Sequence, residues 1–252
     1  MTQRIHKAIA ASGLASLRNA ERMIREGRVA VNGEDAVIGQ RIDPVQDRVE
    51  VDGVVLPVAP GLSYYLLNKP RDVVSTAADT HGRKTVVDLV AAPSRVWPVG
   101  RLDADSEGLI ILTNDGTLTH RLTHPRFDVE KTYTVLVLAD VAPEDVARLT
   151  AGVELDDGLA VARSARLVDQ RPGKTLVEVV MMEGRNREVR RMFATLGYDV
   201  ERLVRTAIGG LRDQQLRPGT ARLLTIEEVR GLYEVAGAAW QDDDPTPTNG
   251  QT

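Results

Sequence analysis

The stretch PVGRLDADSEGLIILTNDG, residues 98–116, sets three carboxylates directly ahead of an almost wholly aliphatic run. The carboxylates belong to Asp103, Asp105 and Glu107. Residues 109–113 read as a buried strand, and residues 114–116 (Asn-Asp-Gly) as the turn that ends it. A carboxylate in the loop before a buried strand is held by a rigid element and partly shielded from water, where its basicity and nucleophilicity can be tuned. The stretch therefore predicts a functional acid at the mouth of a strand.

Strands and helices continue from this stretch in both directions. The pattern predicts further strands at residues 63–70, 95–100, 131–138, 159–168, 174–183 and 201–211. It predicts helices at residues 84–90, 117–124, 143–152, 186–197 and 226–239. Because strands and helices do not alternate regularly, we expect a mixed, mainly antiparallel α+β domain rather than a doubly wound one.

The first 60 residues follow a different pattern. Residues 3–11 predict one helix, and a second helix begins after Ser16 as N-cap and ends near Gly27. Short strands come next, with an Asn-Gly turn at residues 32–33 and a hairpin around residues 52–53. We therefore expect a small domain made of a helix pair and short strands.

Composition shifts indicate how the chain divides. Residues 57–61, PVAPG, read as a linker, and residues 241–252 read as a disordered acidic tail rich in Pro, Asp and Thr. The expected organisation is a helix-pair domain at 1–60, a mainly antiparallel domain at 61–240 and the tail at 241–252.

The composition of the 252 residues excludes several kinds of site. There is no cysteine, which excludes disulfides, thiolate catalysis and cysteine-ligated zinc. No segment is apolar enough to be a signal peptide or a membrane span, and neither glycine-rich nucleotide motif occurs. We expect a cytoplasmic protein without a membrane partner, and a monomer, because no apolar heptad pattern stands out.

Basic residues cluster at the N-terminus although the formal net charge is -4 at pH 7. Up to residue 28 the bases are Arg4, Lys7, Arg18, Arg22, Arg25 and Arg28, and the acids are Glu21 and Glu26. Six bases minus two acids leave a local excess of four. At helical spacing Arg18, Arg22 and Arg25 share one face of the second predicted helix, opposite Leu17, Ala20 and Ile24. By charge alone this is a solvated helix face; phosphate binding is the alternative.

Two stretches of the sequence partly match metal-binding motifs, one for calcium and one for zinc, but each lacks a residue that its motif needs. The acids of the opening stretch begin like a calcium loop, but Asn114 stands where the closing bidentate glutamate is needed. His120 and His124 are four residues apart, as in zinc proteases, but Arg121 replaces the general-base glutamate. We therefore expect no metal.

Longer strings of sequence resemble known families. LASLRNAERMIREGRVAVNGEDA resembles the small RNA-binding domain first described in a ribosomal small-subunit protein, which grips RNA with a basic helix pair. GRLDADSEGLIILTNDG resembles the catalytic signature of the pseudouridine synthases, in the branch that modifies ribosomal RNA and carries that same domain. LLNKP, EKTYTV, EGRNREVRRM and LVRTAIGGL extend this resemblance through almost the whole chain before the tail. It implies a pseudouridine synthase fold and a ribosomal RNA substrate, most similar to enzymes acting on the large subunit.

The resemblance also implies roles for individual residues. Asp103 falls on the catalytic aspartate, which acts either as nucleophile on the anomeric sugar carbon or as base on the neighbouring sugar hydrogen. Tyr133 falls on the tyrosine that packs against the target base and is placed to assist proton transfer. Arg190 falls on the basic residue that pairs with the aspartate, and Leu203 on the apolar residue that closes the pocket. Packing alone also explains Tyr133 and Leu203.

RNA contacts follow from the same resemblance. Arg101, in the Arg-Leu-Asp triplet, is expected to help hold the flipped nucleotide or the gap that it leaves. The N-terminal bases Arg4, Lys7, Arg18, Arg22 and Arg25 are expected to bind RNA phosphates. Arg185, Arg187 and Arg191 are RNA contacts or surface ion pairs, and Asp105 and Glu107 are loop-shaping acids or partners of nearby arginines.

The residue types suit this reaction. Isomerising uridine to its carbon-linked form breaks a glycosidic bond, turns the uracil and rejoins it through a ring carbon, so no redox cofactor, metal or nucleotide is needed. Flipping the base out of stacked RNA costs roughly a few kcal/mol, and stacking on an aromatic ring returns about 1–3 kcal/mol. An arginine beside Asp103 would orient the carboxylate and favour its charged form. The alternatives are a small-subunit ribosomal RNA synthase and an inactive RNA-binding assembly factor.

Overall fold

The computed structural model describes residues 2–12, 14–43, 47–55 and 62–237. The predicted linker (57–61) and acidic tail (241–252) lie outside these residues. Within the described ranges, no helix has the length and apolar character needed to cross a bilayer.

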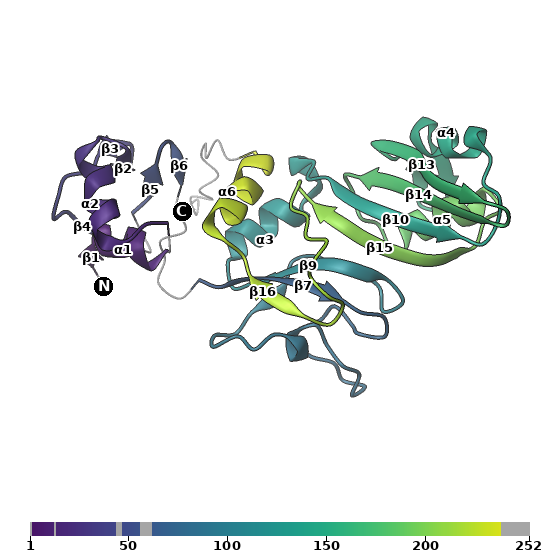
Figure 1. The fold of residues 1–252 in the computed structure, drawn as a ribbon, viewed down its shortest axis with the longest axis horizontal. Coiled ribbons are helices and arrows are strands. Elements are labelled where there is room, and N and C mark those ends of the chain that lie inside the picture. The colour runs from purple at the N-terminus through teal and green to yellow at the C-terminus, as the bar shows by residue number, and fades with distance from the viewer. Residues whose placement is uncertain (1, 13, 44–46, 56–61, 238–252) are drawn as a thin grey trace, which may run out of the picture.

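The N-terminal unit contains the predicted helix pair and short strands, at one end of the molecule (Figure 1). Its helices are α1 (Ile5–Ala11) and α2 (Leu17–Arg25). Its strands are β1 (Gln3–Arg4), β2 (Val29–Val31), β3 (Glu34–Asp35), β4 (Arg41–Ile42), β5 (Val49–Val51) and β6 (Val54–Val55). The first helix begins two residues later than predicted, because residues 3–4 pair with β4 instead. The Ser16 hydroxyl caps α2 by accepting from the Asn19 backbone N–H at 3.3 Å, as predicted.

The rest of the described chain is organised around one eight-stranded sheet, in the order β13-β14-β10-β15-β9-β7-β16, with β8 beside β9. The strands are β7 (Tyr64–Lys69), β8 (Trp97–Pro98), β9 (Glu107–Thr113), β10 (Lys131–Val137), β13 (Ser164–Arg171), β14 (Lys174–Met181), β15 (Val200–Ile208) and β16 (Ala221–Leu223). Every strand pair in this sheet is antiparallel except β9 with β15. The predicted mainly antiparallel α+β class is confirmed.

Four helices and a small hairpin complete this region. The helices are α3 (Gly116–Thr123), α4 (Pro143–Ala151), α5 (Glu188–Thr195) and α6 (Ile226–Val235), with 3-10 turns η1 (Val87–Leu89) and η2 (Pro125–Phe127). The hairpin pairs β11 (Val153–Leu155) with β12 (Gly158–Ala160). The helix predicted at 84–90 is only the short turn η1, and the strand predicted at 159–168 is divided between β12 and β13.

The aliphatic run of β9 is explained by burial on both faces, since all seven of its residues are buried. On one face Leu109 and Ile111 pack with α3 and α6. On the other, Ile110 and Leu112 pack against the segment that connects β7 to β8. Figure 1 shows α3 and α6 on one side of β7 and β9 and this segment on the other. A strand enclosed in this way is a rigid support for the loop that precedes it.

Asp115 has a larger role than the predicted turn former. It is the N-cap of α3, where its carboxylate accepts from the Leu118 backbone N–H at 3.0 Å. The same carboxylate accepts from the hydroxyls of Tyr64 (2.7 Å) and Tyr233 (2.5 Å). Burial, followed by the negative charge of Asp115, raises the pKa of both phenols. Asp115 therefore joins the start of α3 to β7 and α6.

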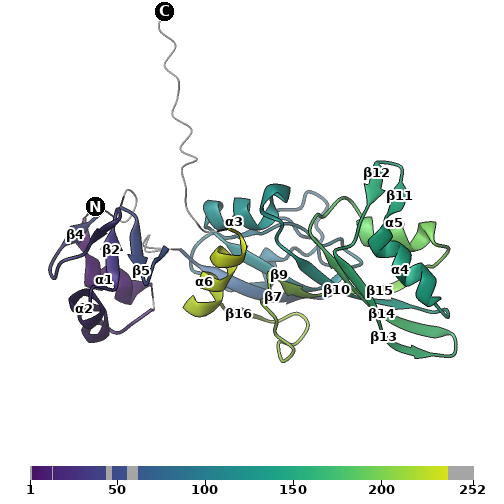
Figure 2. The same cartoon turned by 90° about the horizontal axis from the view of Figure 1, so that it is seen from above.

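The other half of the sheet is covered by α4 and α5, which lie on the same face (Figure 2). Their apolar side chains, such as Leu149 and Phe193, pack on inward residues of β10, β14 and β15, including Val135 and Leu203. The parallel contact of β9 with β15 then joins the two halves through the pair Glu107 and Val204. This contact brings the loop before β9 beside β10 and β15.

Candidate active site

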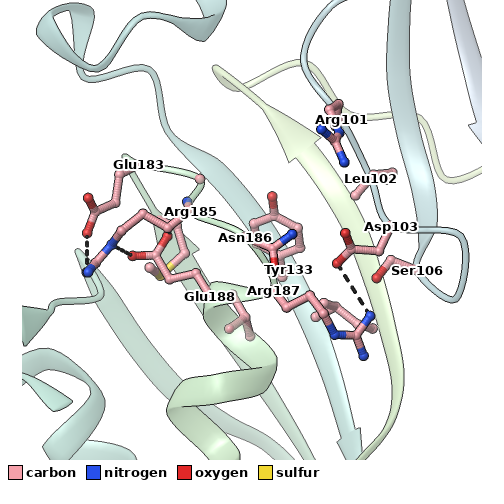
Figure 3. Close-up of a pocket in the computed structure, with 14 residues that line it drawn as sticks. Arg101, Leu102, Asp103, Ser106, Tyr133, Glu183, Arg185, Asn186, Arg187 and Glu188 are labelled. Atoms are coloured by element: carbon pink, nitrogen blue, oxygen red, sulfur yellow. Dashed lines mark hydrogen bonds and ion pairs between the residues drawn. The ribbon is translucent and has the colours of Figure 1, made fainter. Parts of the chain in front are cut away.

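A pocket of about 200 Å³ lies where the two halves of the sheet meet (Figure 3). It is lined by three of the four predicted catalytic residues, Asp103, Tyr133 and Leu203, and by Arg101, Arg185 and Arg187. Asp103 comes from the loop before β9, Tyr133 from β10 and Leu203 from β15. Three segments distant in sequence therefore supply a carboxylate, an aromatic ring and an aliphatic side chain to one pocket.

The loop that carries Asp103 is held on both sides of that residue. On one side the Leu102 N–H donates to Ser75 Oγ at 3.1 Å, and the same hydroxyl donates back to the Leu102 carbonyl at 2.8 Å. On the other side the Ala104 carbonyl accepts from Lys69 Nζ at 3.3 Å. The Asp103 side chain remains 27% exposed, which leaves its carboxylate accessible from the pocket. These contacts orient the acid before any ligand is present.

The arginine closest to Asp103 is Arg187, not Arg190. Arg187 Nη1 lies 3.8 Å from Asp103 Oδ2, and its guanidinium makes two hydrogen bonds to the Asp105 carboxylate at 3.0 and 2.9 Å (Figure 3 shows the contact with Asp103). Arg187 takes a left-handed backbone conformation, with φ of 48°, directly before α5. We attribute the contact of the Arg187 guanidinium with Asp103 and Asp105 to this turn, which precedes the regular helix.

Arg190 lies one helical turn further along and is held elsewhere. Its Nη1 donates to the Val200 carbonyl at 2.7 Å, and its Nη2 donates to the Asp105 carbonyl at 3.2 Å. Its Nε is 3.4 Å from Asp105 Oδ2. The predicted ion pair between Arg190 and Asp103 is therefore replaced by contacts of Arg190 with the neighbouring loop residue.

The two other acids of the opening stretch bind arginines. The hydrogen bonds from Arg187 hold the pKa of the Asp105 carboxyl below its usual value. Glu107 accepts two hydrogen bonds from Arg202, at 2.9 and 2.6 Å, and these likewise lower its pKa. Both acids thus stay charged and tie the loop to α5 and β15.

The remaining arginines of the second basic cluster are ion paired. Arg185 contacts Glu188 at 2.9 Å, and also Glu183 and Asp157 at 3.1 Å each. Arg191 donates two hydrogen bonds of 2.8 Å to Asp157. In these ion pairs the side chains of Arg185 and Arg191 stay 22% and 28% exposed.

The N-terminal bases remain on the surface. Arg4, Lys7, Arg18, Arg22 and Arg25 are all exposed. On α2 the opposite face buries Ala20, Met23 and Ile24, whereas Leu17 is 51% exposed and does not join it. Leu17, the first residue of the helix, therefore lies outside the apolar face that was predicted to include it. On the exposed face Arg22 lies 3.6 Å from Glu26 and Arg25 lies 3.7 Å from Glu21.

No metal centre is found among the described residues, where no group of His, Asp and Glu side chains is arranged to hold an ion. The rings of His120 and His124 have centroids 5.0 Å apart, and both pack edgewise on Phe127. Their spacing on α3 therefore produces an aromatic cluster.

Three buried cations near the pocket were missed by sequence reasoning. Lys69 and Arg205 are buried and Lys131 is half-buried, although each ends or lies within a predicted strand. All three stand in the strings LLNKP, EKTYTV and LVRTAIGGL. Lysine and arginine are rarely buried without a partner. A lysine or arginine inside a predicted buried strand could therefore have indicated a functional residue.

Lys69 should make stability depend on pH. Burial lowers the pKa of Lys69 to about 8, whereas an unfolded lysine titrates near about 10.4. Between these values the unfolded chain binds more protons, so the unfolding free energy should rise with pH. Between pH 7 and pH 10 the unfolding free energy of the native chain should rise by about 2 kcal/mol more than that of Lys69→Met. Urea unfolding of both proteins at the two pH values measures this; parallel pH profiles would contradict it.

Comparisons with known proteins agree with these features. Residues 63–195 match the family described as RNA pseudouridylate synthase, and residues 3–44 match the S4 domain. An uncharacterized RNA pseudouridine synthase of Mycobacterium bovis is 47% identical over 240 residues, which cover 93% of this chain and 94% of the relative. Ribosomal large subunit pseudouridine synthase B of Bacillus subtilis is 39% identical over 238 residues, which cover 93% and 97%.

A solved structure matches as well. A crystal structure of a pseudouridylate synthase superposes with a TM-score of 0.62 at 31% identity, and the match covers 91% of this chain and 99% of the other. The resemblance predicted from the motifs is thereby confirmed for both parts of the chain.

Proposed function

Because the chain belongs to the RNA pseudouridylate synthase family, we propose that it isomerises a specific uridine of large-subunit ribosomal RNA to pseudouridine, with Asp103 as the catalytic residue. The observation that carries the proposal is the convergence of Asp103, Tyr133 and Leu203 on one pocket. The choice of ribosomal RNA rests on the names of relatives such as the Bacillus subtilis enzyme.

The pocket suits a flipped uracil. The aromatic face of Tyr133 offers a stacking surface, and Leu203 offers an apolar contact on the next strand. Stacking of this kind contributes about 1–3 kcal/mol, which offsets a flipping cost of roughly a few kcal/mol. Since Tyr133 is only half-buried, its ring is available to a ligand.

The reaction moves no electrons to or from an outside partner. The bond between the sugar carbon and the ring nitrogen breaks, uracil turns, and the same sugar carbon bonds to a ring carbon. That ring carbon loses its proton, and the released ring nitrogen carries a proton in the product. Asp103 either attacks the anomeric carbon or removes the neighbouring sugar hydrogen. In this proposal Tyr133 assists the proton transfer, and Arg187, 3.8 Å from Asp103, orients the carboxylate. No cofactor is required.

RNA outside the pocket is gripped by the N-terminal unit. Its exposed bases, Arg4, Lys7, Arg18, Arg22 and Arg25, supply phosphate contacts, and Arg101 contacts the flipped nucleotide or its gap. Arg185 and Arg187 contact RNA at the edge of the pocket while retaining their acid partners. We propose that the protein acts as a cytoplasmic monomer.

The test is conversion without additives. Purified protein, incubated with an unmodified transcript of large-subunit ribosomal RNA in chelator and without cofactor, should form pseudouridine at one position. Pseudouridine mapping in ribosomal RNA from cells with and without the gene identifies that position. If the protein binds large- or small-subunit transcripts but converts neither, the result would support an assembly factor instead. If it converts only the small-subunit transcript, its substrate is small-subunit ribosomal RNA.

A further inference from the structure

A second cavity, of about 340 Å³, adjoins the candidate active site. It shares Arg101 and Tyr133 with that site but is not lined by Asp103. Most of the other walls come from α3, η2, the start of β10 and the end of β15, where Leu122, Pro125, Lys131 and Arg205 line it. Its volume falls within the range of about 300–1,000 Å³ that is typical of ligand pockets, so it is large enough for more than a single ion.

The charge in this cavity is unbalanced. Arg205 is 5% exposed; its Nε donates to the Leu109 carbonyl at 2.7 Å, and its Nη1 to the Arg101 carbonyl at 3.5 Å. Its Nη2 is buried and has no hydrogen-bond partner in the part of the chain that the structure describes. A buried guanidinium normally has all its donors satisfied, preferably by an anion. Arg205, which lines the cavity, thus keeps one donor unused.

Lys131 adds a second cation beside it. Among the described residues its Nζ reaches only the Met182 carbonyl, at 3.5 Å. Burial, and then repulsion by the charge of Arg205, lowers the pKa of Lys131 to about 8. Two cations that destabilise each other are a cost to the fold, and sequences keep such conflicts chiefly at functional sites.

No acid in the described chain neutralises this pair. Glu183 also lines the cavity, but it is ion paired with Arg185 at 3.1 Å. Asp128 attracts Lys131 but lies outside ion-pair distance. No carboxylate of the described residues forms an ion pair with Arg101, Lys131 or Arg205. The cavity therefore presents positive charge that only an added anion can balance.

We propose that this second cavity binds the phosphodiester adjoining the flipped uridine, with Lys131 and Arg205 as its phosphate ligands. The inference rests on the proposed function, because it takes the nucleotide in the first pocket to be part of an RNA strand. Arg205 offers directional N–H donors, and Lys131 offers a point charge, which together match a phosphate. The shared wall of Tyr133 and Arg101 places the cavity where the strand must continue from the flipped base.

Salt dependence tests the contact. In an Asp103→Asn background, which prevents turnover, Lys131→Met should weaken binding of the large-subunit transcript about 10-fold. The slope of log affinity against log salt should fall by about 1, as for one lost phosphate contact. The matched control is Lys174→Met. Lys174 is exposed and begins β14, whereas Met181, which pairs with Lys131, ends that strand. This control should keep the native slope.

A neutral linkage identifies which phosphate is bound. In a hairpin carrying the mapped uridine, one methylphosphonate next to that uridine should weaken binding to Asp103→Asn protein about 10-fold. It should have no further effect once Lys131→Met is present. Lys131→Arg should restore both the slope and the sensitivity to methylphosphonate. Additive losses, or an unchanged slope in Lys131→Met, would overturn the proposal.

Two readouts separate this inference from the function and from folding. Without RNA, Lys131→Met should melt no lower than the native chain, because the change removes repulsion from Arg205; a lower melting temperature would assign Lys131 a structural role. If the native chain makes pseudouridine but the charge tests fail, only the phosphate site is wrong. If it makes none in any ribosomal RNA, the proposed function is wrong.

Discussion

Replacing Asp103 by asparagine is expected to lower the rate of pseudouridine formation by about 10³-fold or more, because the amide can neither attack carbon nor accept a proton. The fold should persist, since among the described residues this side chain forms one ion pair, with Arg187 at 3.8 Å. RNA affinity should therefore remain close to that of the native chain. Single-turnover conversion and equilibrium binding of the same transcript measure the two effects separately.

The matched control for this change lies two residues away. Asp105→Asn removes a carboxylate from the same loop, but one that is held by two hydrogen bonds from Arg187. Its loss should slow conversion about 10-fold by loosening the arginine. Equal losses in the two variants would assign the acids a shared structural role, and a native rate in Asp103→Asn would exclude catalysis by Asp103.

Gly108→Ala is expected to destabilise the protein by at least about 3 kcal/mol. Gly108 has φ of 105° and pairs with Arg205 where β9 and β15 run parallel. A Cβ atom there would overlap the Arg205 carbonyl oxygen and lie 2.6 Å from its amide nitrogen. Backbone cannot rotate away as a flexible side chain can, so the joint between the two halves of the sheet must open.

The control for this prediction is Gly116→Ala. Gly116 begins α3, has no positive φ, and leaves open space around an added Cβ. Alanine there should leave the unfolding free energy unchanged or raise it by a few tenths of a kcal/mol. Urea unfolding of both variants measures the difference. Similar stabilities would show that β9 and β15 can separate without cost.

The elements that sequence patterns predicted well are those with local causes. The N-cap of α2 at Ser16 and the strand β9 follow from residues within a few positions of each other. The predictions failed where a distant contact decides the outcome. Residues 3–4 join a strand because β4 offers them a partner, and residues 159–168 divide because β12 forms its own hairpin with β11.

The candidate site divides in the same way. The sequence shows the motif around Asp103 as acids ahead of an aliphatic run. The resemblance of the chain to known synthases then predicted that Tyr133 and Leu203 belong to the same site. The partner of Asp103 was not visible. Arg187 and Arg190 are three residues apart on the same stretch and both contact the loop at Asp105, but only Arg187, at the left-handed turn, forms an ion pair with Asp103.

By itself, the sequence determined the class of fold, the position of the candidate catalytic loop and the family, because periodicity, turn residues and long motifs are local properties. The tertiary structure alone decided which cations meet. Arg187 reaches Asp105 across 82 residues of sequence, and Lys131 and Arg205 share a cavity because β10 pairs with β15. Electrostatic contacts depend on distances in space, and those arise only when the two halves of the sheet join at Gly108.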